Sequence, residues 1–282
     1  IVFIKQVPDT TDVKIDPETN TLIREGVRSV INPFDLFAIE EALRLREANG
    51  GRVWVVTMGP PQALAALREA MAMGADEAAL VSDRAFAGSD TLATSYTLAQ
   101  AAKKIGKFDL IICGKQASDG DTAQVGPGIA VQLGLPQAAF VKRVDEVKGR
   151  AITVQRMTEE GHDVVRMPLP AVITVVKEIG TPRYPSLVGK VRARRHQIPV
   201  WGPSDLRCDE RRIGLAGSPT WVERIFAPPA RKGGEALAAS EESIGAVARE
   251  VAEYLGNRWT PPMRPAHRRS PSGPSPGRWR SI

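Results

Sequence analysis

Residues 114–128, GKQASDGDTAQVGPG, carry the pattern that most suggests ligand chemistry. An apolar run typical of a buried strand, FDLIICG, comes before them, and a predicted helix at 122–133 comes after. Free backbone N–H groups at a helix N-terminus attract phosphate. We expect Asp119 or Asp121 to cap this helix, which would stabilise it by ~1 kcal/mol. The remaining N–H groups, together with Thr122 and Gln124, are then expected to bind phosphate.

A second polar stretch, SDRAFAGSDT at 82–91, follows another predicted strand. Its small residues allow a ligand to approach the backbone closely, and it offers the donors Arg84, Ser89, Thr91 and Thr94. The alternative is a solvated turn in which Asp90 only caps the next helix.

Residues for acid–base or metal chemistry are scarce. His162, His196 and His267 all lie outside the predicted nucleotide-binding half, so the sequence predicts neither a catalytic triad nor a histidine metal site. Two cysteines are too few for a disulfide framework or a zinc site. The spacings GxxxxGK[ST] and, after the first strand, GxGxxG are absent. The residues therefore indicate a nucleotide-binding protein with no catalytic or metal-binding residues, which leaves open whether it is an enzyme.

The elements that must position these loops alternate over the first ~135 residues. The sequence predicts strands at 1–7, 52–58, 77–82 and 108–114, and helices at 32–47, 61–74, 90–105 and 122–133. This alternation is typical of an α/β, Rossmann-like fold, a mostly parallel sheet with helices on both faces. Ligands of such sheets bind at the carboxyl ends of the strands, where both polar stretches fall.

The helix at 32–47 has a recognisable start. Asn32 suits the N-cap, Pro33 the first helical position and Asp35 the third. A small hairpin is predicted at 13–24, and if it folds back over the sheet, Asn32–Asp35 joins the strand-end site.

The alternation of predicted strands and helices ends after residue 137. Strand-like segments at 138–178 predict an antiparallel extension of the same sheet. After Gly180 the chain is rich in proline and arginine without regular periodicity, until an amphipathic helix at 241–256. We divide the chain into a nucleotide- or flavin-binding domain (1–180), a recognition loop with a long C-terminal arm that packs on another subunit (181–256), and a disordered tail (257–282).

Composition limits the class of protein. The 25% charged and 43% hydrophobic residues are typical of soluble globular proteins. No apolar stretch approaches the roughly 20 residues of a membrane span. The chain opens inside a strand pattern, so we expect no signal peptide and a cytoplasmic location. Much of the net charge of +6 lies in 190–196 and in the tail, and we expect no specific nucleic-acid binding.

Seven separated segments together resemble the β subunit of electron-transfer flavoproteins over roughly residues 1–230. They are IVFIKQVPDT (1–10), NPFDLFAIEEALRL (32–45), VVTMGPP (55–61), AMGADEA (72–78), GKQASDGDTAQVGP (114–127), PLPAVITV (168–175) and TPRYPSLVGKVRARR (181–195).

The resemblance implies an electron carrier that pairs with an FAD-containing α subunit and serves an acyl-CoA-dehydrogenase-like or other flavin dehydrogenase. Ordinary β subunits bind AMP. In PRYPSL, Leu187 would anchor the partner beside Tyr184; the alternative is that Leu187 packs against its own domain. The cofactor-binding positions implied are Phe3, Asn32, Pro33, Phe34, Asp35, Met58, Asp119, Gly120, Asp121, Thr122, Ala123, Gln124, Val125, Gly126, Pro127 and Gly128.

Two stretches, 82–95 and 118–127, resemble the electron-bifurcating subgroup, in which FAD replaces AMP. That adds Asp83, Arg84, Ser89, Asp90, Thr91 and Thr94 to the cofactor site, with Arg84 stabilising a reduced flavin. NADH would reduce this FAD. One electron would pass to the α-subunit FAD and a dehydrogenase, and the other to ferredoxin or flavodoxin. NADH oxidation is expected only in the αβ complex.

Three alternatives remain. The first is a non-bifurcating β subunit with structural AMP. The second is a stand-alone nucleotide-binding or nucleotide-cleaving α/β protein, which would be expected to have a serine- and glycine-rich loop after the first strand, where this chain has Gln6–Asp9. The third is a ligand-sensing stress-type module, which leaves the long arm and PRYPSL unexplained.

Overall fold

The computed structural model describes residues 1–9, 29–223, 237–238 and 240–258. The chain forms two compact units, residues 1–226 and 227–282, each described by itself. In the second unit, α7 (Ile244–Arg258) confirms the helix predicted at 241–256. The hairpin predicted at 13–24 and nearly all of the predicted tail lie outside the described residues.

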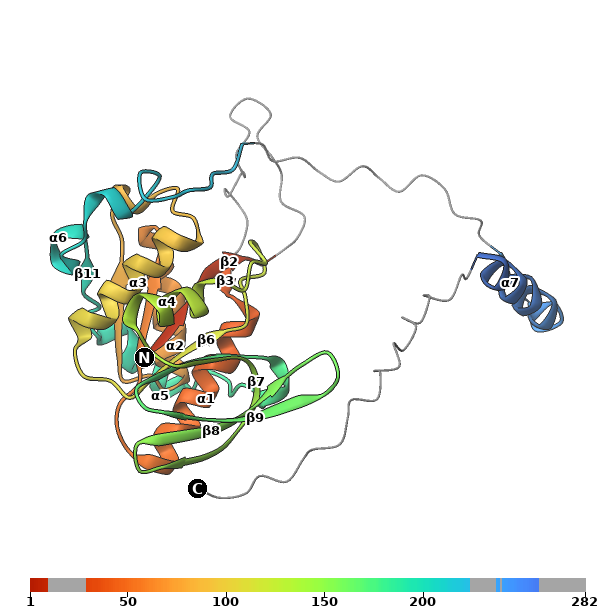
Figure 1. Cartoon of the computed structure of the whole chain (residues 1–282), viewed down its shortest axis with the longest axis horizontal. Helices are drawn as coiled ribbons and strands as arrows, with labels where there is room; N and C mark the ends of the chain where they lie inside the picture. The colour runs from red at the N-terminus through yellow and green to blue at the C-terminus, as the bar shows by residue number, and fades with distance from the viewer. Residues whose placement is uncertain (10–28, 224–236, 239, 259–282) are drawn as a thin grey trace, which may run out of the picture. The chain divides into compact units, whose positions relative to one another are not determined.

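A nine-stranded sheet organises the first unit (Figure 1), and it confirms the predicted α/β class. Its order is β11-β5-β4-β1-β6-β10-β7-β8-β9, and neighbouring strands from β11 to β7 are parallel. The strands are β1 (Val2–Ile4), β4 (Trp54–Met58), β5 (Glu77–Val81), β6 (Leu110–Gly114), β7 (Gln137–Lys148), β8 (Ala151–Met157), β9 (His162–Pro168), β10 (Ala171–Val175) and β11 (Val200–Trp201).

Alternating side chains of the parallel strands supply two cores, one on each face of the sheet. On β1, Val2 and Ile4 belong to one core and Phe3 to the other. The first core is covered by α1 (Pro33–Asn49), α2 (Leu64–Met73) and α5 (Leu187–Arg195). The second is covered by α3 (Thr91–Ile105), α4 (Val125–Leu133) and α6 (Pro203–Leu206). Short 3₁₀ turns are η1 (Pro61–Ala63), η2 (Arg84–Phe86), η3 (Lys177–Ile179) and η4 (Glu210–Arg212).

The extension predicted at 138–178 is antiparallel from β7 to β9. Its last strand, β10, instead returns to lie between β6 and β7 and is parallel to both. Two further elements occur where the sequence shows no regular periodicity: the helix α5, and β11, which pairs with β5 at the edge of the sheet.

The strand order reverses at β1, which has β4 on one side and β6 on the other. Ligands of such sheets bind in the crevice at the carboxyl ends of the strands at this reversal. Beyond β1, a two-stranded antiparallel ribbon of β2 (Gln6–Pro8) and β3 (Ser29–Ile31) returns the chain to the start of α1. The first turn of α1 therefore lies at the crevice. Among the described residues, no helix has both the length and the apolar character needed to cross a membrane.

Candidate functional site

The N-cap of α1 holds the loop that follows β6. The Asn32 side chain is buried; its Nδ2 donates to the Gln116 carbonyl at 2.8 Å, and its Oδ1 accepts from the Ser118 N–H at 3.0 Å. Asn32 occupies the predicted N-cap position, but its side chain makes no capping bond to α1. The amide instead spans the loop that starts the GKQASDGDTAQVGPG segment.

Asp35 ties together the ends of β1 and β6. Its carboxylate is buried and accepts from the Lys5 N–H at 2.7 Å and from the Gly114 N–H at 3.2 Å. Burial raises the pKa of Asp35 to about 7, although hydrogen bonds from Lys5, Asn32 and Gly114 oppose the shift. Asp35 is therefore a link between strands as well as an acidic residue in the first turn of α1.

The prediction that Asp119 or Asp121 caps the following helix is wrong. Asp119 forms an ion pair with Lys5 Nζ at 2.7 Å, and Asp121 accepts a hydrogen bond from Gln116. The helix α4 begins at Val125, later than the predicted 122, so both carboxylates lie too far before it, and Gln124 at the N-cap makes no side-chain capping bond. Lys5 thus offsets the charge of Asp119, and Gln116 stabilises the Asp121 carboxylate by a hydrogen bond.

The backbone N–H groups at the start of α4 have no acceptor in the part of the chain that the structure describes. Among the described residues, none accepts from the N–H groups of 122–126, and Pro127 has no N–H. Asp121 and Ala123 have φ angles of 53° and 54°, while Gln124 is right-handed. A left-handed residue followed by a right-handed one, as at Ala123 and Gln124, turns successive N–H groups toward one side, the geometry of an anion-binding nest. This run of donors is the chemical centre of the candidate site.

Two glycines predicted to contact the cofactor serve packing. A Cβ at Gly126 would collide with Thr174 of β10, and one at Gly128 would collide with Ser95 of α3. Both glycines allow α4 to lie close to the sheet and to α3, and so they set where the N–H groups point.

The stretch at 82–91 lies beside this loop. Thr91 Oγ1 donates to Gln124 Oε1 at 3.2 Å, which brings the two predicted regions together. Ser89 is used by the fold, since its hydroxyl donates to the Phe86 carbonyl and accepts from the Gly214 N–H. Asp83 caps the short turn η2 by accepting from the Ala85 N–H.

Arg84 and Thr94 remain available to a ligand. Arg84 is exposed, and in the described part of the chain neither its guanidinium nor the half-buried Thr94 hydroxyl has a hydrogen-bond partner.

Asp90 caps α3, as the alternative for this stretch predicted. It accepts from the N–H groups of Leu92 and Ala93 and also from the N–H and hydroxyl of Thr220. Burial alone would raise the pKa of Asp90, but these hydrogen bonds hold it below its ordinary value.

Asp90→Ala is expected to lower the free energy of unfolding by ~1–2 kcal/mol, because the first turn of α3 loses its cap and Thr220 loses its acceptor. Urea denaturation at pH 7 measures this loss. Asp83→Ala is the matched control, because Asp83 caps only a three-residue turn and should cost less. An equal loss in the two variants would contradict the prediction.

The remaining predicted cofactor residues differ in burial and in their surroundings. Phe3 is buried in the core between β1 and the α3–α4 face. Met58 ends β4 and lines a small cavity of about 120 Å³ with Lys5 and Asp119. Phe34 is half-buried with Lys115 Nζ 5.8 Å from its ring centroid, whereas Pro33 is exposed.

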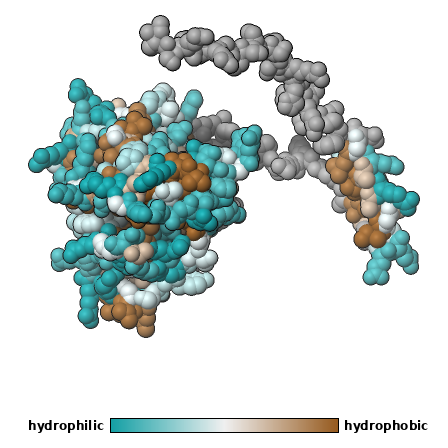
Figure 2. Space-filling model, turned by 60° about the horizontal axis from the view of Figure 1, so that its bottom comes forward, coloured by the Kyte–Doolittle hydropathy of each residue, from teal (hydrophilic) through white to brown (hydrophobic). Residues whose placement is uncertain are grey.

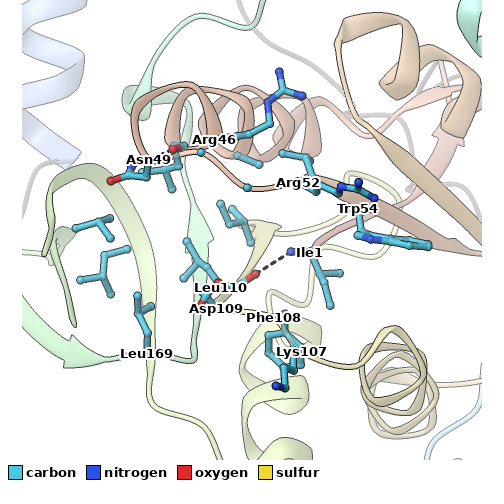
Figure 3. A pocket seen from close by; sticks show the side chains of 18 of the residues that line it. Ile1, Arg46, Asn49, Arg52, Trp54, Lys107, Phe108, Asp109, Leu110 and Leu169 are labelled. Carbon is cyan, nitrogen blue, oxygen red and sulfur yellow. Dashed lines mark hydrogen bonds between the residues drawn. The ribbon is translucent and has the colours of Figure 1, made fainter. Parts of the chain in front are cut away.

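A separate cavity of about 510 Å³ lies at the amino ends of the strands (Figure 3). The backbone nitrogen of Ile1 donates there to the Leu110 carbonyl at 2.8 Å, and charged groups including Arg46, Arg52 and Lys107 line the cavity. It includes none of the predicted site residues and lies at the end of the sheet opposite to the one where such folds bind ligands. We assign no ligand to it.

Exposed apolar side chains lie outside the crevice as well. Tyr184 is 93% exposed and Leu187 is 79% exposed. The alternative that Leu187 packs against its own domain is therefore wrong. The helix α7 shows an apolar side and a polar side (Figure 2).

Within the described residues, no group of histidine, cysteine and carboxylate side chains is arranged to bind a metal.

Sequence reasoning missed several residues of the crevice. Lys5 forms an ion pair with Asp119, and Gln116 donates a hydrogen bond to Asp121. Ser95 Oγ donates to the Val125 carbonyl at 3.3 Å. Lys5 lies inside the strand predicted at 1–7, and its partner Asp119 lies far along the chain, so the local sequence gives no signal for this ion pair.

Comparison with known proteins gives a consistent result. Residues 19–206 match the family model described as electron transfer flavoprotein domain. The chain is 48% identical to the electron transfer flavoprotein subunit beta of Megasphaera elsdenii, over 90% of this chain and 97% of that protein. It is also 48% identical to the caffeyl-CoA reductase-Etf complex subunit CarD of Acetobacterium woodii (90% and 95% covered) and to protein FixA of Azotobacter vinelandii (86% and 89%).

Proposed function

The chain belongs to the electron transfer flavoprotein family as a β subunit, and from this premise we propose that it binds FAD in the crevice between β1 and β6 and takes part in electron bifurcation. Membership implies an α subunit and further electron-transfer partners. What the β subunit binds, and which partners it serves, belong to the proposal.

The run of N–H groups at 122–126, which have no acceptor among the described residues, is the observation that supports a bound pyrophosphate. Lys5 offsets the charge of Asp119, and Gln116 holds Asp121, so neither carboxylate has to face the anion. The amide of Asn32 keeps the loop in place. The residues therefore fit a dinucleotide phosphate with the protein dipoles already oriented.

The stretch at 82–94 supports FAD over AMP. Arg84 is an exposed cation close in the chain to Thr91, which contacts the phosphate loop. A guanidinium there is suited to a flavin that gains negative charge on reduction. Because Ser89 and Asp90 are used by the fold, the side chains left to contact the flavin from this stretch are Arg84, Thr91 and Thr94. The name of the A. woodii relative, a caffeyl-CoA reductase-Etf complex subunit, agrees with a dehydrogenase-coupled role.

Bound FAD would accept a hydride from NADH. It would then pass one electron to the α-subunit FAD and its dehydrogenase, and the other electron to ferredoxin or flavodoxin. The chain itself binds the phosphates through 122–126, orients the flavin through Arg84, and holds the loop through Asn32. We place this complex in the cytoplasm.

Flavin content per αβ heterodimer, with AMP quantified after denaturation, tests the proposal. Two FAD and no AMP are expected. One FAD with one AMP would replace it by the non-bifurcating alternative. A colourless monomer that turns over ATP would instead support a stand-alone nucleotide-cleaving protein.

We further propose that Tyr184 and Leu187 contact the partner dehydrogenase, and that α7 packs its apolar side on the α subunit. Leu187→Ala is expected to raise the KM for the dehydrogenase by about tenfold or more, since burying a leucine side chain contributes roughly 1.5–3 kcal/mol. Steady-state assays with the dehydrogenase varied measure this change. Flavin content should stay unchanged, and an unchanged KM would remove Leu187 from the contact.

A further inference from the structure

Arg183 fastens the segment that carries Tyr184 and Leu187 to the helix α1. Its Nε and Nη2 bind the two carboxylate oxygens of Glu40 at 2.8 and 2.9 Å, and its backbone N–H donates to the same carboxylate at 2.9 Å. Its Nη1 and Nη2 also bind Glu47, at 2.5 and 3.1 Å. One guanidinium thus bridges two carboxylates two turns apart on α1.

The geometry of this contact is that of a strong, directional ion pair. The Glu40 side chain is 10% exposed, and its two oxygens face the planar fork of the guanidinium. Burial alone would raise the pKa of Glu40, but the hydrogen bonds from Arg183 hold it below its ordinary value, so the pair is ionised at neutral pH. A lysine cannot reproduce a fork that also reaches a second carboxylate.

The other end of the segment is fastened to α2. The Ser186 N–H donates to the Ala72 carbonyl at 3.1 Å, and the Ser186 hydroxyl caps α5 by accepting from the Gly189 N–H at 2.9 Å. One turn later, Arg192 donates to the carbonyls of Met71 and Ala75 at 3.0 and 2.8 Å. We call residues 183–187, which are anchored at Arg183 and at Ser186, the strap.

The strap displays its apolar side chains without covering them. Tyr184 lies between the two anchors and Leu187 directly follows the second, and both are largely exposed. Pro185 fixes one backbone φ angle between them. A segment ordered in advance loses less conformational entropy when a partner binds, and so retains more of the contact energy as affinity.

From this arrangement we infer that Arg183 is a positioning residue that holds the strap in its docking conformation through Glu40 and Glu47. The occupant is the flavin dehydrogenase of the proposed function, on which this inference rests. Arg183 acts through Tyr184 and Leu187 and does not take part in electron transfer within the β subunit.

Arg183→Ala in the αβ heterodimer is expected to raise the KM for the partner dehydrogenase by about tenfold, while kcat at saturation and flavin content stay within about twofold. Arg183→Lys should recover part of the affinity, and Glu47→Gln should cost less than Arg183→Ala because Glu40 still holds the guanidinium. Arg150→Ala, which removes one cation at the β7–β8 turn, is the matched control and should leave KM unchanged.

The double variant Arg183→Ala with Leu187→Ala separates positioning from a general loss of structure. If Arg183 acts through Leu187, the two effects on KM are less than additive. Additive effects, a KM within twofold of the wild type, or a parallel fall of kcat and flavin content would overturn the inference. If Arg183→Ala does not fold, Arg183→Lys and Glu47→Gln are each combined with Leu187→Ala, and their effects on KM are compared in the same way. A normal KM in Leu187→Ala would instead remove the docking surface itself, and with it this part of the proposed function.

Discussion

Asn32→Ala is expected to lower the affinity for the nucleotide by about tenfold or more and the free energy of unfolding by about 2 kcal/mol. The variant deletes both the donor to the Gln116 carbonyl and the acceptor for the Ser118 N–H. The loop then loses its attachment to α1, and the N–H groups of 122–126 no longer face the phosphate in a fixed arrangement. Equilibrium dialysis of FAD and AMP against deflavinated heterodimer measures the affinity.

Two further variants make this test specific. Asn32→Asp keeps an acceptor for Ser118 and loses the donor to Gln116, so its affinity should lie between those of Asn32→Ala and the wild type. Asn49→Ala removes an exposed asparagine at the other end of α1, whose amide donates to the Leu45 carbonyl within the same helix, and should leave the affinity unchanged. An Asn32→Ala protein that keeps its full affinity would mean that the loop is ordered without this side chain.

The position of the site follows from the sequence because parallel strands have a strong local signal. Apolar residues at successive positions of 52–58, 77–82 and 108–114 indicate strands buried on both faces, and polar residues directly after them mark the carboxyl ends. β4, β5 and β6 lie inside these ranges, so the crevice could be predicted without knowing any long-range contact.

The roles of individual residues in the loop depend on contacts that the sequence does not display. An aspartate before a helix is a good cap, yet Asp119 pairs with Lys5 from the opposite end of the first 120 residues. A glycine in a polar loop suggests that a ligand approaches the backbone closely. At Gly126 and Gly128, however, glycine is needed because a Cβ would collide with Thr174 and Ser95. Short polar side chains have several local hydrogen-bonding options, so the tertiary contacts decide which one forms.

The helix α5 was missed for a related reason. LVGKVRARR has a glycine and two valines, which lower its intrinsic preference for helix. Its Ser186 cap and the bonds of Arg192 to the end of α2 supply what the local sequence lacks.

Asp35 is expected to make stability depend on pH in the sense opposite to that of an ordinary surface carboxylate. Its pKa rises from 3.8 to about 7 in the folded protein because burial disfavours the charge. The folded protein therefore holds this proton more tightly than the unfolded chain does. The contribution to stability is complete below about pH 4 and is lost as the pH rises toward 7, by at most about 4 kcal/mol at 1.36 kcal/mol per pKa unit.

Comparison with Asp35→Asn isolates this group. Glu41 titrates over the same range, since burial raises its pKa to about 7 as well, but it is present in both proteins and largely cancels in the difference. The amide of asparagine accepts from only one of the Lys5 and Gly114 N–H groups, a cost that does not change with pH. The free energy of unfolding of the wild type minus that of Asp35→Asn, from urea denaturation at pH 4 to 8, should therefore fall as the pH rises and level off above pH 7. A difference that is flat, or that rises with pH, would show that the Asp35 carboxylate is already stabilised as the anion by Lys5 and Gly114 at pH 4.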